Sequence, residues 1–225
     1  MNIDINKISV LTGMVYSTPI SLLDEGLMNF KNLTFSRKLK DSRWDIYLYF
    51  SEEPLNGEDF YNIEGPYNYP IFYRPGKGKI LVLSHSKRII QDFEERSLKK
   101  NRLKHIQNTL INIDDLVKLI VTKPESNYVL TFANAMYNLH GGALKYVTFY
   151  GEDLALASIF KENLLAMSFN RCGLKELSSD HEIMKLGNDG SIQIMFRKND
   201  THHYAEIDGV LRFINDHKYF QVVNR

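Results

Sequence analysis

Histidines next to acidic residues are the first side chains in this sequence that could do chemistry. Two clusters lie late in the chain, Asp180-His181-Glu182 and Asp200-Thr201-His202-His203. Imidazole and carboxylate groups are ligands that zinc, manganese and iron accept, so a metal-dependent hydrolase or nuclease is one hypothesis. The spacing matches no defined metal signature, and adjacent histidines before a helix are usually a polar first turn. We therefore assign no metal-binding residue and keep the metal enzyme as the alternative.

The sequence contains no recognisable nucleophile or phosphate loop. Ser84-His85-Ser86 lies between an expected strand and an expected helix, where the first N–H groups of the helix could bind an anion, but Ser84 or Ser86 more often simply caps the helix. The single cysteine, Cys172, lacks the electropositive, open surroundings that a reactive thiol needs. Gly76-Lys77-Gly78-Lys79 lacks the spacing of a nucleotide-binding loop and precedes a strand instead of following one. The catalytic residues stay unassigned, and we expect no cofactor.

A basic run begins at Lys87, and its second half has no acidic residue. At 3.6 residues per turn, several of its cations would share one side of a helix. Such a stripe could track phosphates even in a neutral protein, because the attraction depends on the local patch and not on the total charge. The alternative is a solvated helix face. The candidate nucleic-acid-binding residues are Lys87, Arg88, Arg96, Lys99, Lys100 and Lys104.

Alternating residues of two expected strands would form an open sheet face. A strand at 143–150 puts its tyrosines on one side, and a strand at 191–197 puts a methionine and an arginine away from its apolar side. Such a face is more often covered by another domain or a partner subunit than used to stack bases, and the aromatic motif of RNA-recognition domains is missing. A tyrosine-rich segment at 60–74 is a second candidate, because tyrosine concentrates in binding hot spots. The candidate partner-binding residues are Tyr146, Tyr150, Met195, Arg197, Tyr67, Tyr69 and Tyr73.

Hydrophobic periodicity predicts that residues 1–139 form a sheet-rich module with helices. Alternating apolar side chains predict strands at 7–16, 33–39 and 44–50, and a continuous apolar run predicts a buried strand at 79–84. We expect an edge strand at 69–74 and a further strand at 128–133. The polar turn Lys40-Asp41-Ser42-Arg43 joins the second and third of these strands as a hairpin. Apolar residues at helical spacing predict a short helix at 21–31, a long basic helix near 86–107 and another short helix at 114–121.

Residues 143–225 follow the order strand, helix, strand, strand, helix, strand. The strands are expected at 143–150, 182–186, 191–197 and 219–223, and the helices at 152–171 and 204–217. Gly187-Asn188-Asp189-Gly190 is a strong hairpin signal, and His140-Gly141-Gly142 would link the two modules. The order predicts a ferredoxin-like module, in which two helices cover one face of a four-stranded antiparallel sheet. The predicted fold class is therefore α+β.

Composition limits the classes of function. The 225 residues carry 28 Lys and Arg against 27 Asp and Glu, and a net charge of +1 argues against a basic protein coating a polyanion. One cysteine excludes a disulfide framework, and the apolar runs are far shorter than the roughly 18 residues that span a bilayer. We expect a cytoplasmic protein without membrane contact. It would be a non-catalytic binding or adaptor subunit that contacts a protein partner or a second copy of itself, and that could bind nucleic acid through the basic helix.

Overall fold

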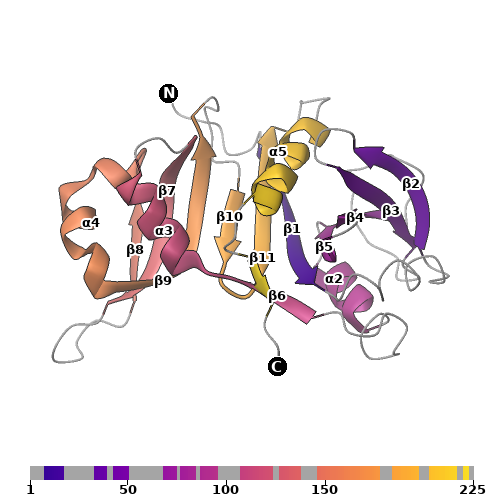
Figure 1. Cartoon of the computed structure of the whole chain (residues 1–225), viewed down its shortest axis with the longest axis horizontal. Helices are drawn as coiled ribbons and strands as arrows, with labels where there is room; N and C mark the ends of the chain where they lie inside the picture. Colours follow the sequence, from indigo (N-terminus) through magenta and orange to yellow (C-terminus); the bar gives the residue numbers. More distant parts are fainter. Residues whose placement is uncertain are drawn as a thin grey trace.

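The computed structural model (Figure 1) describes residues 8–17, 33–39, 43–50, 68–74, 77–84, 87–95, 107–123, 127–137, 146–177, 184–197, 203–216 and 220–222. Within these ranges the chain is a mixed α/β protein with more strand than helix, built on one large antiparallel sheet. The strands are β1 (Ile8–Ser17), β2 (Leu33–Leu39), β3 (Trp44–Phe50), β4 (Asn68–Arg74), β5 (Lys79–Ser84), β6 (Gln107–Ile111), β7 (Tyr128–Tyr137), β8 (Val147–Tyr150), β9 (Met167–Glu176), β10 (Met184–Gly187), β11 (Ser191–Arg197) and β12 (Phe220–Val222).

Four short α-helices accompany the described strands. They are α2 (Lys87–Glu94), α3 (Ile113–Thr122), α4 (Ser158–Asn163) and α5 (His203–Asp216). Two 3-10 turns, η3 (Leu154–Leu156) and η4 (Leu164–Ala166), flank α4. Among the described residues, no helix has the length and apolar character needed to cross a membrane.

The sheet has the strand order β2-β3-β4-β5-β1-β11-β10-β9-β7-β8, and β6 pairs with the end of β1 and with β12. Strand β1 lies near the middle and joins strands that are far away in sequence, β5 on one side and β11 on the other. The predicted division between residues 1–139 and 143–225 stays a prediction, and strands from both of its sides share this one sheet.

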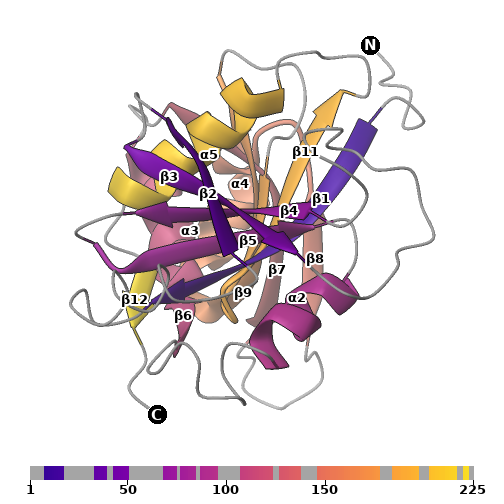
Figure 2. The ribbon, with the colours of Figure 1, turned by 90° about the vertical axis from the view of Figure 1, so that its right-hand side faces the viewer.

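The two faces of the sheet bury different cores. On β1, Leu11 and Val15 belong to the larger core, which includes apolar residues of α3, α4 and α5. The neighbouring Tyr16 points to the opposite side, where α2 contributes Ile90 and Phe93 to a smaller, aromatic core. This alternation is the period of an extended strand. Figure 2 shows α5 and α2 on opposite sides of the strands.

Helix α2 is attached to the sheet by tyrosine hydroxyls as well as by apolar contacts. The Tyr16 hydroxyl donates to Glu94 Oε1 at 2.7 Å, and the Tyr49 hydroxyl donates to Asp92 Oδ2 at 2.8 Å. The Phe93 ring lies 5.4 Å from the Tyr49 ring in an edge-to-face arrangement and 5.9 Å from the Tyr16 ring. These contacts fix one face of α2 against the sheet and leave Gln91 exposed.

The turn between β10 and β11 organises the centre of the sheet. Its Gly190 has a φ of 86°, a conformation that glycine adopts without strain. The Gly190 carbonyl accepts the Val15 N–H at 3.0 Å, and the Asn188 carbonyl accepts the Ile111 N–H at 3.2 Å. The predicted turn therefore exists, and its backbone also contacts β1 and β6.

The ferredoxin-like arrangement of residues 143–225 is not confirmed. The helix predicted at 152–171 is helical only in short segments, and β9 begins at Met167. The cause is visible in the burial of this stretch: Met167 and Phe169 are buried while Ser168 is exposed, which is the alternation of a strand. The last strand, β12, pairs with β6 and not with a strand of the same module.

Several local predictions are confirmed. The hairpin at 33–39 and 44–50, the strand at 79–84 and the second strand of the Gly187–Gly190 hairpin have the predicted bounds. The predicted basic helix near 86–107 is correct for residues 87–94, whereas residue 107 already belongs to β6. Residues 96–106, and the helix predicted at 21–31, lie outside the described residues.

Candidate binding face

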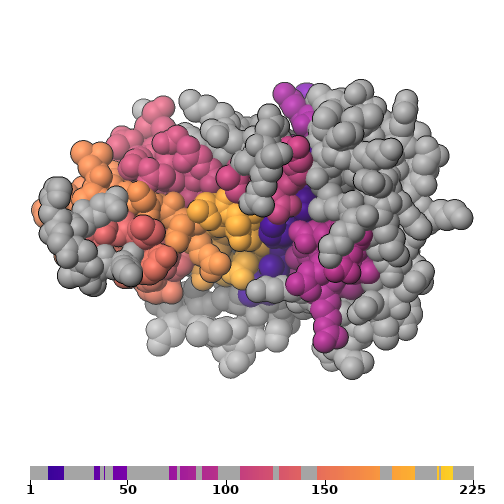
Figure 3. Space-filling view, turned by 90° about the horizontal axis from the view of Figure 1, so that it is seen from below, coloured from indigo at the N-terminus to yellow at the C-terminus, as the bar shows by residue number. Residues whose placement is uncertain are grey.

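The sheet has a pocket on the side that faces away from α3 and α5. Its volume is about 440 Å³, within the range of ligand-binding clefts. Strands β1, β11, β10, β9, β7 and β8 contribute to its floor, and Ile90 and Gln91 of α2 contribute to its wall. Figure 3, seen from below, shows the gold atoms of β10 and β11 between the magenta α2 and the orange and red strands.

One row of residues crosses the pocket floor perpendicular to six strands. Thr12 of β1 is opposite Gln193 of β11, which is opposite Lys185 of β10. Lys185 is opposite Gly173 of β9, Gly173 is opposite Phe132 of β7, and Phe132 is opposite Tyr150 of β8. All of these except Gly173 line the pocket.

The glycine in this row explains a contact between its two neighbours. Because Gly173 has no side chain, Lys185 and Phe132 can meet above it, with Nζ 5.2 Å from the ring centroid. A cation in this position is attracted by the ring electrons, an effect of about 0.5–2 kcal/mol. On its other side, the Phe132 ring lies 5.1 Å from the Tyr150 ring at an interplanar angle of 41°. Phe132 is 8% exposed, whereas Tyr150 is 73% exposed.

A second row places Arg171 beside this group. Arg171 of β9 is opposite Asn134 of β7 and Gly187 of β10, and Asn134 Nδ2 donates to Thr148 Oγ1 of β8 at 3.0 Å. The Arg171 side chain is exposed and lines the pocket. Within the described residues, its guanidinium makes no recorded hydrogen bond or ion pair.

Two β-bulges turn these residues toward the pocket. The β7–β9 register shifts between Leu130 and Phe132 and again between Asn134 and Ala135. Leu130 belongs to the larger core, so an unbroken strand would point Phe132 into that core as well. Phe132 instead lines the pocket, because the extra residue at the bulge reverses the side. At the second shift the extra residue is Asn170, so Arg171 faces the pocket although Phe169, two residues earlier, is buried in the larger core.

The described lining of the pocket carries more positive than negative charge. Among the described residues, its cations are Arg171 and Lys185, and its carboxylate is Asp189. Asp189 Oδ1 accepts the Ser191 N–H at 3.0 Å and the Ser191 hydroxyl at 2.5 Å, so this carboxylate is used to hold the β10–β11 turn. An anionic ligand would therefore meet two cations together with the polar ends of Gln193, Thr12 and Gln91.

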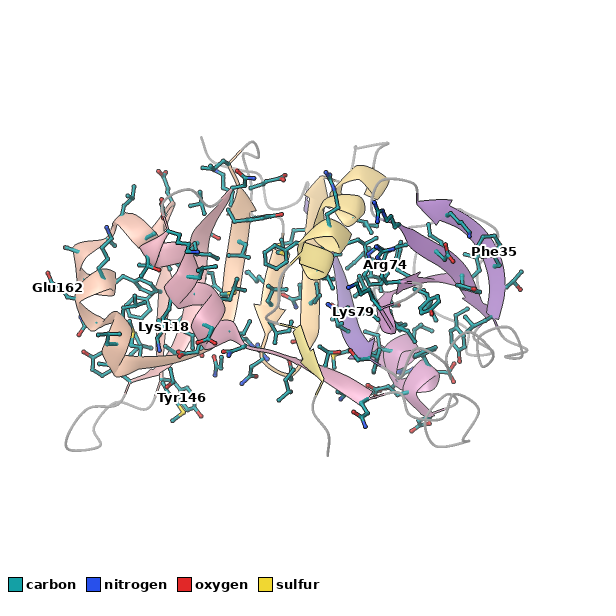
Figure 4. All side chains as sticks on the ribbon, viewed as in Figure 1. Phe35, Arg74, Lys79, Lys118, Tyr146 and Glu162 are labelled. Carbon is teal, nitrogen blue, oxygen red and sulfur yellow. The ribbon has the colours of Figure 1, made fainter. Side chains whose placement is uncertain are left out.

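The structure brings part of the predicted partner surface together. Tyr150 lines the pocket, and Tyr146, at the other end of β8, is 63% exposed (Figure 4). Met195 is half-buried beside the exposed Val10 of β1. We define the open face by the residues that share this side of the sheet, which are Val10, Thr12, Phe132, Asn134, Tyr146, Thr148, Tyr150, Arg171, Lys185, Gln193 and Met195.

Among the other predicted partner residues, the structure describes the side chain of Tyr73 alone. Tyr73 is 2% exposed and packs in the smaller core, so its side chain is not on the surface. Tyr69 lies in β4 and Arg197 in β11, but the positions of their side chains are not described. Tyr67 lies outside the described residues.

The candidate nucleic-acid residues are described only in part. Arg88 is exposed on α2, and Lys87 is the first residue of that helix. The remaining candidates, Arg96, Lys99, Lys100 and Lys104, lie outside the described residues.

The alternative hypothesis is a metal-dependent enzyme. Among the described residues, no group of three or more His, Cys, Asp or Glu side chains could hold a metal ion. His203 begins α5, and His181 and His202 are outside the described residues. Comparison of the sequence with protein-family models and with curated proteins found no match.

Proposed function

We propose that the protein is a non-catalytic binding subunit that receives a partner protein on the open face. One observation carries the proposal: six neighbouring strands expose aromatic, polar and charged side chains on the side of the sheet opposite the α3–α5 core. Tyrosine and arginine are the residues that most often dominate binding energy at protein interfaces, and this face has exposed Tyr146, Tyr150 and Arg171.

The extent of the face also favours a partner larger than a metabolite. Tyr150 ends β8 and Tyr146 directly precedes it, so the two tyrosines span about 13 Å at the usual strand rise. Across the sheet, the face reaches from β8 to Val10 on β1, which is 42% exposed. A small molecule in the pocket would leave both Tyr146 and Val10 uncovered.

Binding fits this face better than catalysis does. Acid–base or nucleophilic catalysis needs a nucleophile and a base held within hydrogen-bond reach of each other. The described pocket residues contain no histidine or cysteine, and the Ser191 hydroxyl donates to a carboxylate that holds a turn.

Site-specific cross-linking tests the proposal. A photoreactive amino acid at Gln193, which is exposed in the pocket, should capture a single protein in the native cell. The same amino acid at Glu162, on the outer surface of α4 in Figure 4, is the matched control and should not capture it. Capture of the same protein from both positions, or from neither, would contradict docking on the open face.

Nucleic-acid binding through the basic run stays a prediction with its own test. Charge reversal at Lys99, Lys100 and Lys104 should weaken any binding to nucleic acid, and binding by the parent should fall steeply with salt because counterions are released. A 260/280 nm ratio recorded across the size-exclusion peak at low and high salt shows whether nucleic acid is bound. Light scattering on the same peak shows whether the partner is a second copy of the chain.

A further inference from the structure

We propose that the pocket on the open face binds an acidic peptide segment, whose carboxylates pair with Arg171 and Lys185. This inference rests on the proposed function, because it names the chemistry of the partner segment that enters the pocket. The carboxylate groups would lie between the two cations, and the rest of the segment would extend over the open face.

The placement of the two cations is the first argument. Lys185 is opposite Gly173, and Arg171 is two residues before Gly173 on the same strand and the same side. The two positions are therefore about 7 Å apart along the strand direction and about 5 Å apart across it, by the usual strand dimensions. Two long side chains at this separation can converge on one carboxylate or hold two neighbouring ones, and arginine offers paired donors that match a carboxylate.

The state of the charges is the second argument. The guanidinium of Arg171 has no hydrogen-bond or ion-pair partner among the described residues, and Asp189 accepts hydrogen bonds from Ser191. Lys185 is held over the Phe132 ring, which limits the conformations that its ammonium group can take. A cation that is already positioned loses less entropy on binding than a mobile one.

The aromatic residues favour a peptide over single-stranded nucleic acid. Binding to single strands uses ring faces on which bases stack, together with a groove of several cations along the backbone. Phe132 is 8% exposed, with Lys185 over its ring and Tyr150 beside it, so Phe132 is poorly placed to stack on a base. The exposed ring in this row is that of Tyr150. Within the described lining, the cations are Arg171 and Lys185, which suit one or two carboxylates.

The polar residues around the cations suit a peptide backbone. Gln193 and Gln91 are exposed and carry amide groups, each of which can donate to a carbonyl and accept from an N–H. Val10 and Met195 extend the face on one side of the pocket with apolar area for side chains of the segment.

A random peptide library tests the inference without knowledge of the partner. Twelve-residue peptides selected on the purified protein should be at least twofold richer in Asp and Glu than the input library. A fluorescent copy of a selected peptide should bind at least tenfold more weakly to Arg171→Gln and to Lys185→Gln. Lys161→Gln, which removes an exposed cation of α4 on the other side of the sheet, should change the affinity less than twofold.

Other outcomes overturn the inference. Selection of neutral or basic peptides, no selection at all, or equal binding to the three variants would each exclude an acidic segment in this pocket. Tighter binding of a fifteen-nucleotide oligo-dT than of any peptide at the same salt concentration, weakened at least tenfold by Arg171→Gln and by Lys185→Gln, would make the pocket a nucleic-acid site. Circular dichroism and thermal melting of each variant show that the fold is intact. If the peptide experiments fail in one of these ways but cross-linking at Gln193 still captures a specific protein, the proposed function stands and only the acidic segment is excluded.

Discussion

The ammonium group of Lys185 lies 5.2 Å from the centroid of the Phe132 ring, although β9 separates the strands that carry the two residues. The residue of β9 between them is Gly173, which provides no side chain to keep them apart. The contact fixes the position of one of the two pocket cations, so it connects the sheet register to the proposed binding chemistry.

Replacing this glycine tests the contact directly. In Gly173→Val, a side chain should separate Lys185 from Phe132, while the β-branched residue remains suited to a strand. Ring currents should shift the Lys185 ε-methylene protons upfield in the NMR spectrum of the wild-type protein. The shift should disappear in Gly173→Val and also in Phe132→Leu. Lys185 signals at the positions of a solvated lysine in the wild-type protein would contradict the contact.

The Tyr16–Glu94 hydrogen bond should contribute to the stability of the fold. Burial and the nearby Glu94 carboxylate raise the pKa of the Tyr16 hydroxyl, so it stays protonated and donates to Glu94. Tyr16→Phe should lower the free energy of unfolding by about 1.5–3 kcal/mol, the usual contribution of a hydrogen bond to a charged group. Urea denaturation measures the change. In a double-mutant cycle with Glu94→Gln, additive losses would show that the two side chains do not interact.

Lys79 should give the stability of the protein a pH dependence. The Lys79 Nζ donates to the Ile214 carbonyl in the last turn of α5 at 3.0 Å. Burial, and to a lesser extent the positive charge of the nearby Lys77, lower the pKa of Lys79 from 10.5 to about 8. Between pH 8 and 10 the unfolded chain keeps this proton while the folded chain loses it, so a rise in pH favours the folded state. The free energy of unfolding of the wild-type protein should therefore rise over this window relative to Lys79→Met.

Urea denaturation of both proteins at pH 7, 8, 9 and 10 measures that difference. We expect an increase on the order of 1–2 kcal/mol, which allows for partial solvent screening. Parallel curves for the two proteins would show that Lys79 has the same pKa in the folded and unfolded chains.

Gly190 should be one of the least replaceable residues of the sheet. Its φ of 86° disfavours other residues, and a Cβ atom there would lie 2.2 Å from the Thr109 carbonyl oxygen. Gly190→Ala should therefore lower the free energy of unfolding by about 2–4 kcal/mol, through backbone strain and overpacking. Gly209→Ala is the matched control, because a Cβ atom there meets nothing within 4 Å and the residue lies within α5. The control should be neutral or stabilising by up to about 1 kcal/mol.

The local elements could be predicted where the pattern and the turn agree. The β2–β3 hairpin combines two alternating runs with a polar turn, and the β10–β11 hairpin has two glycines around Asn188 and Asp189. The helix predicted at 152–171 is wrong where β9 begins, because Leu164 and Met167 have helical spacing, whereas Met167 and Phe169 have the burial of a strand. Apolar spacing alone does not distinguish the two in a short run.

The pocket could be predicted only in part, because it depends on register. Tyr150 was found from alternation within one strand, but Phe132, Arg171 and Lys185 come from three different strands. Two bulges in the β7–β9 pair decide which side Phe132 and Arg171 face. No local signal marks these bulges, since the extra residues are an ordinary threonine and asparagine.

The most direct measurement of the central claim compares complexes isolated from the native cell through a tag on three forms of the protein. These are the wild type, Arg171→Glu combined with Lys185→Glu, and the control Lys161→Glu, with recovered proteins quantified by mass spectrometry. Docking on the open face predicts that the recovery of one protein falls at least tenfold with the double variant and is unchanged with the control. A tenfold loss of affinity is equivalent to about 1.4 kcal/mol of binding free energy. If every protein recovered with the wild type is recovered equally with the double variant, the open face is not the partner site.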